Sequence, residues 1–584
     1  MRIGFACLAG ALILSLGTAA IGSEDATRLA PPEPLSPWAG VDREIEFLVA
    51  RGELPFEAWS FRPVDRGELA GWLSERGNAA HIRWVPGATG VPSGASRLPD
   101  VAGAPYADNP SRQRLAALLA WDAQRWSGPT PGKSRRPGAL IQFAADDRLL
   151  LLAPYARFMP AFRTGERIDW TDSTRVGFRA IFYAGRSVVI SSGFYAAEID
   201  RARGFADPLV AGSDVILHAD EVTLSADLGG LQLRLGRDRH HWGPGLGGTL
   251  LLSETAVPFD FVEYQLRLGR QFRFLALTGE TSAAVAVDRA SSAPAANPGR
   301  HRFLSAHRLL WTITPDLCVG LSEGARYQAD SPSMLYLSGI VPYTLVERLQ
   351  MQDEPSDSTE NYLRNNVLWS LDVAWRVQPG WFLYGELLAD DIVTETSEAP
   401  TRGGFQLGTT WAPQHRWRDW TLGLQYTRVS DYTYSVYYQN QCQCDWDHQG
   451  RSLGYPGGPD VEEILLRAGV AASPRWSLRG WVRHIRRGGG TLGVPWQPES
   501  TGCDPAASEN CGEVGAWSFP ANPLNVWRTG FAVDYRRGPV LWGGASIERV
   551  AANQDVYACP GGCGGWFPEH KRELLFSFYL SAGI

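Results

Sequence analysis

The chain has little of several features that would point to other kinds of protein. Its 584 residues include 4 Met beside 23 Trp and 23 Phe, and 55 Lys and Arg against 62 Asp and Glu give a formal charge of −7. This balance argues against a nucleic-acid binder that uses a basic surface. Charged residues make up 20% and hydrophobic residues 44%, which argues against intrinsic disorder. No self-similarity recurs at intervals of about 20 to 50 residues, which argues against a propeller.

Only one long apolar run is present. The stretch 3–22 follows a weakly basic start and ends in small residues, which is typical of a secretory signal peptide. We therefore expect residues 1–22 to be a signal peptide, cleaved between Ala19 and Ser23, that exports the chain. The alternative is an uncleaved anchor helix, for which the run is short.

Cysteine is scarce, and one of the 8 Cys falls within the expected signal peptide. Export makes disulfides possible in the rest of the chain. Two close pairs bracket short segments and could close surface loops: Cys503 with Cys511, and Cys559 with Cys563. The odd number that remains leaves one thiol over, for which Cys318 is the candidate.

A zinc site is the alternative interpretation of part of this cysteine set. Cys442, Cys444 and His448 have the right ligand chemistry. Their spacing differs from the usual C-x2-C arrangement, so we expect no metal and no other cofactor.

The first part of the mature chain has helical periodicity. Three stretches place their apolar residues on one helical face: Val41 to Val49, Leu69 to Leu73, and Leu115 to Leu119. Asp65 lies three residues before Glu68 and can cap the second helix, while Ser111 can cap the third. These stretches predict a small helical bundle over residues 23–130, with a polar, Pro- and Gly-rich linker at 127–138.

From about Ala139 to Ile584 the period changes to two. In the stretch 367–377, Val, Trp and Leu at odd positions alternate with the polar residues Ser370, Asp372 and Arg376. The same alternation recurs in other stretches: 176–182, 222–228, 231–235, 405–411, 420–427, 529–535 and 574–580. Soluble two-sheet domains and membrane barrels both contain strands of this kind.

Three features favour the membrane barrel. Many strands end in Trp or Tyr, the chain has an export signal without a spanning helix, and short turns alternate with long ones. At about 25 residues for a strand with its share of loops, the segment holds roughly 18 strands. The sequence therefore predicts an all-β transmembrane fold, a large antiparallel barrel over residues 131–584 preceded by the helical bundle.

The most distinctive segment is LGRDRHHWGPGLGGTLLLSETAVPF, residues 235–259. It resembles the signature of the Wzi family of capsule-assembly outer-membrane proteins, in which a strand ending in Gly-Arg precedes basic and aromatic residues, Trp-Gly-Pro-Gly and a Leu-rich segment. LYGELLADD at 383–391 and RSLGYPGGPD at 451–460 are similar to two later blocks of that family. The resemblance covers nearly the whole mature chain.

This resemblance implies an outer-membrane barrel whose helical bundle lies on the periplasmic side, and which binds surface polysaccharide and helps to attach or assemble capsule without acting as an enzyme. The expected partners are an acidic surface polysaccharide and outer-membrane lipid, with no nucleic acid and a monomer favoured. A porin is the main alternative, decided by whether the lumen is blocked. An outer-membrane hydrolase is less favoured, because the G-x-S-x-G patterns at Ser322 and Ser452 lack the strand-to-helix context of a nucleophile.

The 235–259 block also has a physical interpretation. It gathers cationic, hydrogen-bonding and aromatic side chains: Arg237, Arg239, His240, His241 and Trp242. Arginine can pair with a uronate carboxylate, and an aromatic ring can stack on a sugar face. A second candidate surface is the aromatic stretch with Tyr432, Tyr434 and Trp446. The alternative is that the block braces the barrel interior through pairs with Glu254 or Glu386.

Overall fold

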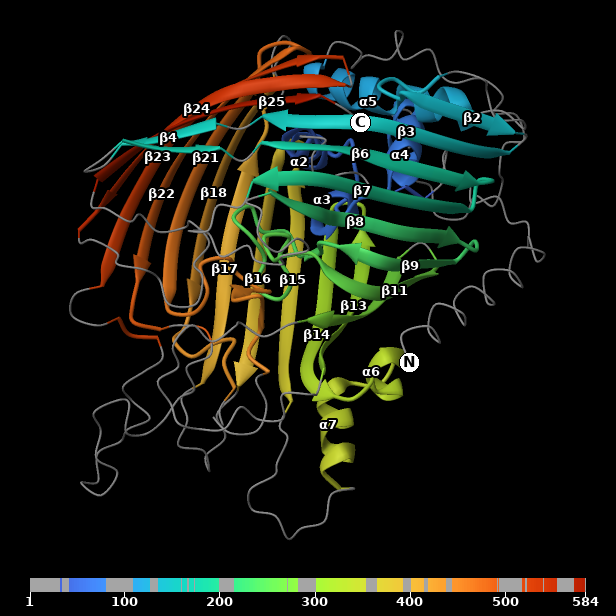
Figure 1. Ribbon diagram of the computed structural model, residues 1–584. Helices are drawn as coiled ribbons and strands as arrows, with labels where there is room; N and C mark the ends of the chain where they lie inside the picture. The colour runs from blue at the N-terminus through green and yellow to red at the C-terminus, as the bar shows by residue number, and fades with distance from the viewer. Residues whose placement is uncertain are drawn as a thin grey trace, which may run out of the picture.

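A computed structural model shows a closed antiparallel barrel with helices packed inside one end (Figure 1). It describes the following residues: 32–33, 41–79, 109–126, 135–145, 147–158, 160–164, 168–172, 174–198, 215–269, 271–281, 301–352, 365–391, 401–413, 419–436, 444–490, 492, 517–519, 523–538, 540–553 and 572–582. The expected signal peptide and the cysteine pairs Cys503–Cys511 and Cys559–Cys563 lie outside these residues.

The helices fall into two groups. Four lie near the N-terminus: α2 (Asp42–Arg51), α3 (Glu57–Ser60), α4 (Arg66–Ala79) and α5 (Pro110–Trp126). Two belong to one long connection: α6 (Met334–Ser338) and α7 (Tyr343–Gln352). Among the described residues, no helix is long and apolar enough to cross a membrane.

The barrel strands follow in chain order. They are β2 (Ile141–Ala145), β3 (Arg148–Phe158), β4 (Pro160–Thr164), β5 (Ile168–Asp172), β6 (Arg175–Ala184), β7 (Val188–Glu198), β8 (Val215–Asp227), β9 (Leu231–Asp238), β11 (Phe259–Leu268), β12 (Phe272–Thr281), β13 (His301–Thr314), β14 (Leu317–Ala329), β15 (Asn366–Gln378), β16 (Trp381–Asp391), β17 (Arg402–Trp411), β18 (Asp419–Val429), β21 (Val461–Ala471), β22 (Trp476–Arg487), β23 (Leu524–Arg537), β24 (Leu541–Ala552) and β25 (Arg572–Ala582). Four short strands lie outside the barrel sheet: β1 (Phe61–Arg62), β10 (His241–Trp242), β19 (Asp447–His448) and β20 (Arg451–Ser452).

These segments make 18 strand positions, which confirms the strand number predicted from the sequence. β3 continues into β4, and β5 continues into β6, because β4 pairs with β5 while β3 pairs with β6. β2 and β25 share the remaining position, since both pair with β3, at opposite ends of it. The two ends of the barrel sheet therefore close through one composite strand.

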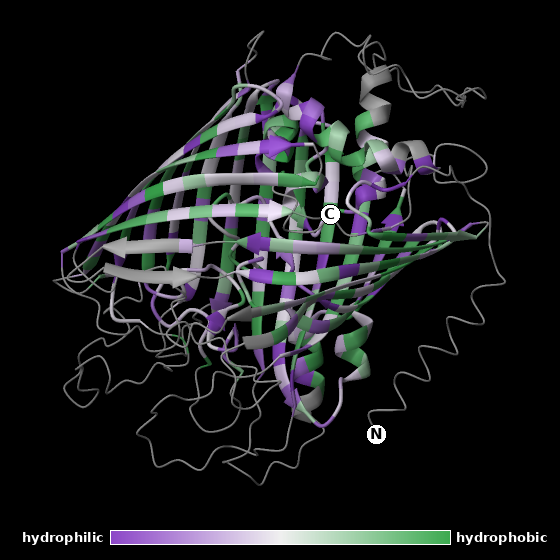
Figure 2. Ribbon diagram, turned by 45° about the horizontal axis from the view of Figure 1, so that its top comes forward, coloured by the Kyte–Doolittle hydropathy of each residue, from purple (hydrophilic) through white to green (hydrophobic). Residues whose placement is uncertain are grey.

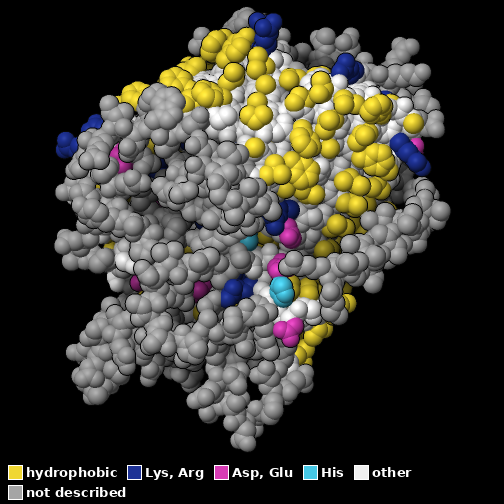
Figure 3. Space-filling model, in the orientation of Figure 1, with side chains coloured by type: hydrophobic (Ala, Val, Ile, Leu, Met, Phe, Trp, Pro, Cys, Tyr) yellow, Lys and Arg dark blue, Asp and Glu magenta, His cyan; other side chains and the backbone are white. Residues whose placement is uncertain are grey.

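The period-two pattern assigns the two faces of the wall correctly. In β15 the odd-numbered Leu371, Val373 and Trp375 are 38–49% exposed, whereas Asp372 and Arg376 on the other face are buried. Hydropathy alternates along the strands in the same way (Figure 2). In Figure 3 hydrophobic side chains cover most of the visible wall, and the charged ones gather toward its edges. The outer face is thus an apolar belt suited to lipid.

The two ends of the barrel differ. At one end strands are joined by short turns such as 228–230, 315–316 and 379–380, and at the other by long connections such as 239–258 and 330–365. Barrels of the bacterial outer membrane keep their short turns on the periplasmic side. The expected alternation of short and long turns is confirmed.

The helical bundle packs inside the short-turn end. Apolar residues of α2, α4 and α5 form one buried cluster with inward-facing wall residues, among them Leu310, Ala374 and Phe382. The amide of Gly380, in a short turn, donates to the carbonyl oxygen of Ala50 at 2.9 Å. The bundle therefore fills the short-turn end of the barrel and packs against the inner wall.

The predicted helix caps were right for α4 and wrong for α5. Asp65 Oδ1 accepts the amide of Glu68 at 3.0 Å, as the spacing predicted. For α5, Asn109 Oδ1 accepts the amide of Arg112 at 3.1 Å, and Ser111 lies inside the helix with its amide donating to Asp419. The reason is Pro110, which favours the first helical position and moves the cap back to Asn109.

The described end of the predicted linker is anchored rather than loose. Arg136 is buried, and its guanidinium donates from Nη1 and Nη2 to the carboxylate of Glu33 at 2.9 Å. The three arginines around Glu33, those at 136, 66 and 179, lower its pKa against the opposing effect of burial. This paired carboxylate ties the segment before α2 to the start of the barrel.

Candidate functional site: the lumen plug and the loop end

The distinctive 235–259 block contains the connection from β9 to β11, residues 239–258, which folds into the lumen and which we call the plug. Its short strand β10 pairs with β1 of the N-terminal region, with Trp242 opposite Phe61 and His241 opposite Arg62. The indole of Trp59 also donates to the carbonyl oxygen of Pro244 at 2.8 Å. A connection from the long-loop end thus meets the bundle from the short-turn end inside the barrel.

Three of the residues expected to contact polysaccharide are enclosed in this plug. His240, His241 and Trp242 are 1–2% exposed, and Trp242 belongs to a buried cluster with Leu250 and Phe259. Burial and the neighbouring Arg62 lower the pKa of His241 to about 3, so its ring is neutral at pH 7. With their faces covered, these rings cannot stack on a sugar. Their burial favours a scaffold role, and their contact with glycan stays a prediction.

The second expected surface is mostly buried as well. Tyr434 and Trp446 are fully enclosed, and their side chains donate to the carbonyl oxygens of Leu250 at 2.6 Å and Leu251 at 2.7 Å. Only Tyr432 of this set keeps partial exposure. The aromatic stretch therefore holds the 239–258 connection from the other side. These contacts favour a scaffold role for Tyr434 and Trp446, and their contact with glycan stays a prediction.

Two arginines of the expected site keep access to solvent. Arg237 is about 40% exposed on the outer face at the long-loop end, with its Nε 2.6 Å from Asp260 Oδ1. Arg239 is half-buried, and its amide donates to Asp238 Oδ1 at 2.8 Å. Together with Tyr432 they are the members of the expected set that a ligand can reach.

The alternative interpretation was that the basic residues of the block brace the barrel interior through Glu254 or Glu386. These two carboxylates do make bracing contacts, but with other partners. Glu254 pairs with Arg62 at 2.9 Å, and Glu386 accepts the amide of Leu250 at 3.0 Å. Both contacts join the plug to the rest of the molecule, but neither uses Arg237 or Arg239. Sequence analysis missed strand β1 because it is only two residues long and lies between helices, where a sequence pattern cannot distinguish it from a loop.

The inward-facing arginines are matched by carboxylates. Arg308 donates to Asp372 through both terminal nitrogens, at 2.6 and 2.9 Å, and both side chains are buried. Other arginine pairs repeat this arrangement: Arg326 with Asp447, Arg234 with Asp238, Arg179 with Glu221, and Arg267 with Glu68. Where these pairs lie, the lumen is therefore an ion-paired interior and not a basic channel.

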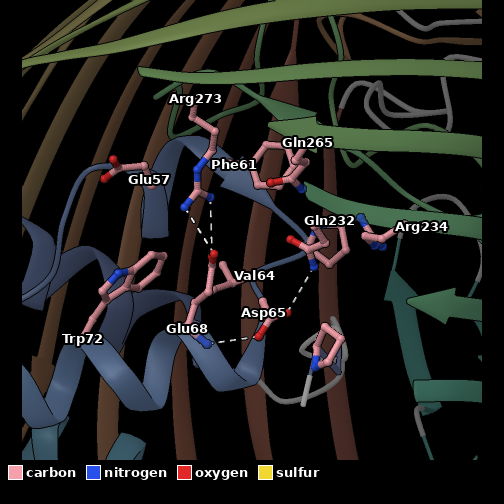
Figure 4. A pocket seen from close by; sticks show the side chains of 12 residues that line it. Glu57, Phe61, Val64, Asp65, Glu68, Trp72, Gln232, Arg234, Gln265 and Arg273 are labelled. Atoms are coloured by element: carbon pink, nitrogen blue, oxygen red, sulfur yellow. Dashed lines mark hydrogen bonds and ion pairs between the residues drawn. The ribbon is translucent and has the colours of Figure 1, made fainter. Parts of the chain in front are cut away.

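Among the described residues, two cavities that lie beside the bundle bear on a binding site. The first has room for about 10 Å³, enough for roughly one water molecule, and lies where Glu68 of α4 faces Arg273 of β12 (Figure 4). The second is about 240 Å³ and lies where the bundle meets β22–β25, with a cationic excess that includes Arg157, Arg479 and Arg536. It borders the short-turn end, away from any polymer on the cell surface.

The metal and hydrolase alternatives gain no support from the geometry. Cys444 is in a disulfide, and Nε2 of the buried His448 lies 3.3 Å from the carbonyl oxygen of Pro258. Within the described residues no group of three or more His, Cys, Asp and Glu could hold a metal.

The two serines of the hydrolase alternative are engaged in other contacts. Ser322 is buried on strand β14 and its hydroxyl accepts a hydrogen bond from Arg308, and the hydroxyl of Ser452 accepts the amide of Gly454. Cys318, the candidate unpaired thiol, is free and buried as expected.

The fold and the filled lumen define a class: a membrane-spanning barrel that holds its own plug. A family model described as capsule assembly protein Wzi matches residues 163–553, and the chain belongs to that family, as its motifs indicated. No curated protein matches it in sequence.

One solved structure shows a similar fold. The chain is similar to Wzi of Escherichia coli, described as an outer-membrane protein involved in group 1 capsule assembly and as a carbohydrate-binding β-barrel. The identity is 13% and the TM-score 0.54, over 94% of this chain and 99% of that one. OccD3 of Pseudomonas aeruginosa matches at 11% identity and TM-score 0.40 over 78% and 95% of the two chains, too distant to carry an argument.

Proposed function

We propose that this protein is an outer-membrane barrel that binds an acidic surface polysaccharide and helps to attach or assemble capsule, without catalysing a reaction. The observation that carries the proposal is family membership over residues 163–553, a range that contains the plug-forming connection and most of the wall. The apolar outer belt supports the location, because such a belt is stable only in a lipid bilayer.

The filled lumen favours this function over the porin alternative. The 239–258 connection and the N-terminal bundle meet inside the barrel through β10 and β1, and Trp59, Trp242 and Trp446 are at most 3% exposed there. A solute channel needs a continuous wet path, and buried side chains occupy this part of the lumen. Ligand binding therefore belongs to the long-loop end, which faces outward when the short turns face the periplasm.

We propose that Arg237, Arg239 and Tyr432 contribute to that surface. A guanidinium can exchange an exposed carboxylate partner for a uronate, because an exposed ion pair contributes only about 0 to 1 kcal/mol. The pair of Arg237 with Asp260 is of this exposed kind. A partly exposed tyrosine supplies stacking area beside such a contact.

The direct test is binding of the purified, membrane-reconstituted protein to an acidic capsular polysaccharide. The matched control ligand is the same polymer with its carboxylates reduced to alcohols. We expect the acidic polymer to bind more tightly, and Arg237→Gln with Arg239→Gln to remove much of the difference. Equal binding of the two polymers would contradict the proposed preference for acidic glycan.

A further inference from the structure

The connection between β14 and β15 carries a helical hairpin, α6 and α7, that lies on the outside of the barrel. Figure 1 shows it beside the long-loop end of β14. Its buried residues Tyr336, Tyr343 and Val346 form a cluster with Phe303 and Tyr327 of the wall. Strand register puts Phe303 and Tyr327 opposite each other and in phase with the exposed Leu309 and Leu321, so all of them face outward. The hairpin therefore covers part of the lipid-facing surface.

Beside these aromatic residues, the covered part of the wall carries a charged pair, Glu323 and His307, unlike the apolar belt around it. Glu323 pairs in register with His307 and Trp369, and faces outward like Leu321 two residues earlier. From Leu317 to Glu323 the strand rises by about 15 Å along the membrane normal, at ~3.3 Å per residue and ~40° tilt, which is inside an apolar band of about 25 Å. Without a cover, a carboxylate would stand in the hydrocarbon region.

The hairpin supplies the partners that this carboxylate needs. The amides of Tyr343 and Thr344, the first residues of α7, each donate to Glu323 at 2.8 Å. Nε2 of His307 lies 3.2 Å from the same carboxylate, and its ring packs against Tyr343 at 4.5 Å between centroids. Glu323 is completely buried as a result. A helix N-terminus favours a negative charge, so the contact fixes α7 to the wall at this depth.

The approach of the hairpin to the wall is close. Gly339, between the two helices, has φ +61°, and a Cβ built on it would lie 2.4 Å from the Cβ of Ala276. The phenol of Tyr264 donates to the carbonyl oxygen of Ser338. On the outer face Ala276 is the register partner of His307 on one side and of Tyr264 on the other. The hairpin therefore lies against strands β11 to β15 of the wall, at the level of Glu323 and His307.

The opposite side of the hairpin is apolar and uncovered. Met334 and Ile340 are each 75% exposed, and Leu345 is 48% exposed. These side chains continue the belt formed on the strands by residues such as Leu321, which is 43% exposed. Arg348 is exposed one helical turn after Leu345, as expected for a cation that reaches from an apolar surface toward lipid phosphates.

We infer that α6 and α7 are embedded in the outer leaflet, with Ile340 and Leu345 in contact with lipid acyl chains. The hairpin covers Glu323 and His307 and presents an apolar surface to lipid in their place, so that the apolar belt is continuous there. This role is independent of polysaccharide binding and depends only on the barrel lying in a membrane.

The test uses a fluorescent label on one cysteine of the full-length protein, in a Cys318→Ala background and reconstituted into phospholipid vesicles. Ile340→Cys carries the label, and Ser331→Cys, an exposed polar position just before α6, is the matched control. We expect lipids with nitroxide groups on their acyl chains to quench the label at 340 several-fold more than the label at 331, and dissolved iodide to show the reverse order.

Equal iodide quenching at the two positions would overturn the inference, because it would place the hairpin in water. A label at 340 shielded from both quenchers would also overturn it, and would indicate that a protein surface such as a second copy covers the hairpin. If Ile340→Cys fails to fold, Leu345→Cys reports on the same surface, with the same two outcomes deciding.

Discussion

Arg376 of strand β15 donates from Nε and Nη2 to the carbonyl oxygen of Val49 in the last turn of α2, at 3.0 and 2.7 Å. The same guanidinium reaches Asp316 in a short turn at 2.6 Å. A cation at a helix C-terminus is stabilised by the helix dipole, and the bonds to Val49 are buried. One wall residue thus connects the barrel, a short turn and the helical bundle.

Arg376→Gln should loosen the bundle while leaving the barrel closed. Truncating a buried, hydrogen-bonded charge costs about 2 to 5 kcal/mol, and most of that loss falls on the bundle contact. We expect faster proteolysis within residues 41–126 in the reconstituted protein. Arg537→Gln, at the exposed end of β23, is the matched control and should leave the cleavage rate unchanged. Equal rates for both variants would show that Arg376 does not anchor the bundle.

The lipid-facing parity of β15 gives a second prediction. Val373 is 38% exposed on the outer face, so Val373→Arg should destabilise the membrane-inserted barrel by about 2 to 4 kcal/mol if it lies near the bilayer midplane. Val373→Leu keeps the apolar surface and should be nearly neutral. Folding into lipid vesicles, titrated with denaturant, measures both. Tolerance of the arginine would mean that this face does not meet lipid.

The filled lumen predicts weak conduction. In planar bilayers the full-length protein should show little steady current, because the bundle and the 239–258 connection block the path. Trp59→Ala removes the hydrogen bond to Pro244 and a buried ring, which costs about 3 to 5 kcal/mol, and should raise the frequency of openings. Large, steady single-channel conductance from the unaltered protein would favour the porin alternative.

Acid should weaken the plug through His241. The pKa of this ring is lowered to about 3 by burial and Arg62, whereas an unfolded histidine has a pKa near 6.5. The released connection therefore binds a proton more readily than the folded one, and the stability that His241 contributes at pH 7 is lost as pH falls from about 6.5 toward 3. Channel openings should become more frequent over this range, and less so in His241→Gln. The same pH response in the variant would assign it to another group.

Much of the fold was predictable because lipid imposes a simple rule on each strand. A bilayer makes every second residue apolar, so the outward positions of β15, β17 and β18 follow directly from alternation. Asp65 was predictable as a helix cap because the contact is local: the amide that it accepts belongs to Glu68, three residues later. Ser111 was misassigned because Asn109 and Pro110 compete with it over the same few residues.

The site was less predictable because it depends on contacts across the barrel. The side chains of residues 240–242 would look the same in the sequence whether they bound a sugar or packed on Phe61. Phe61 lies far earlier in the chain, so local patterns do not reveal the contact. Trp446 has the same ambiguity, resolved only by its bond to Leu251. One overlooked signal was present: Glu323 occupies an outward position between Leu321 and Ala325, a charge on the apolar parity of a strand. Such a break in alternation indicates a cover over the wall.

The most direct measurement of the central claim compares cell-bound and released polysaccharide in cells with and without this protein. Deletion should shift acidic polysaccharide from the cell-bound to the released fraction while total synthesis stays constant, and re-expression of the intact chain should restore it. Re-expression of Arg237→Gln with Arg239→Gln should restore it only in part if these side chains contact the polymer. Unchanged amounts in both fractions after deletion would contradict a role in attaching or assembling capsule.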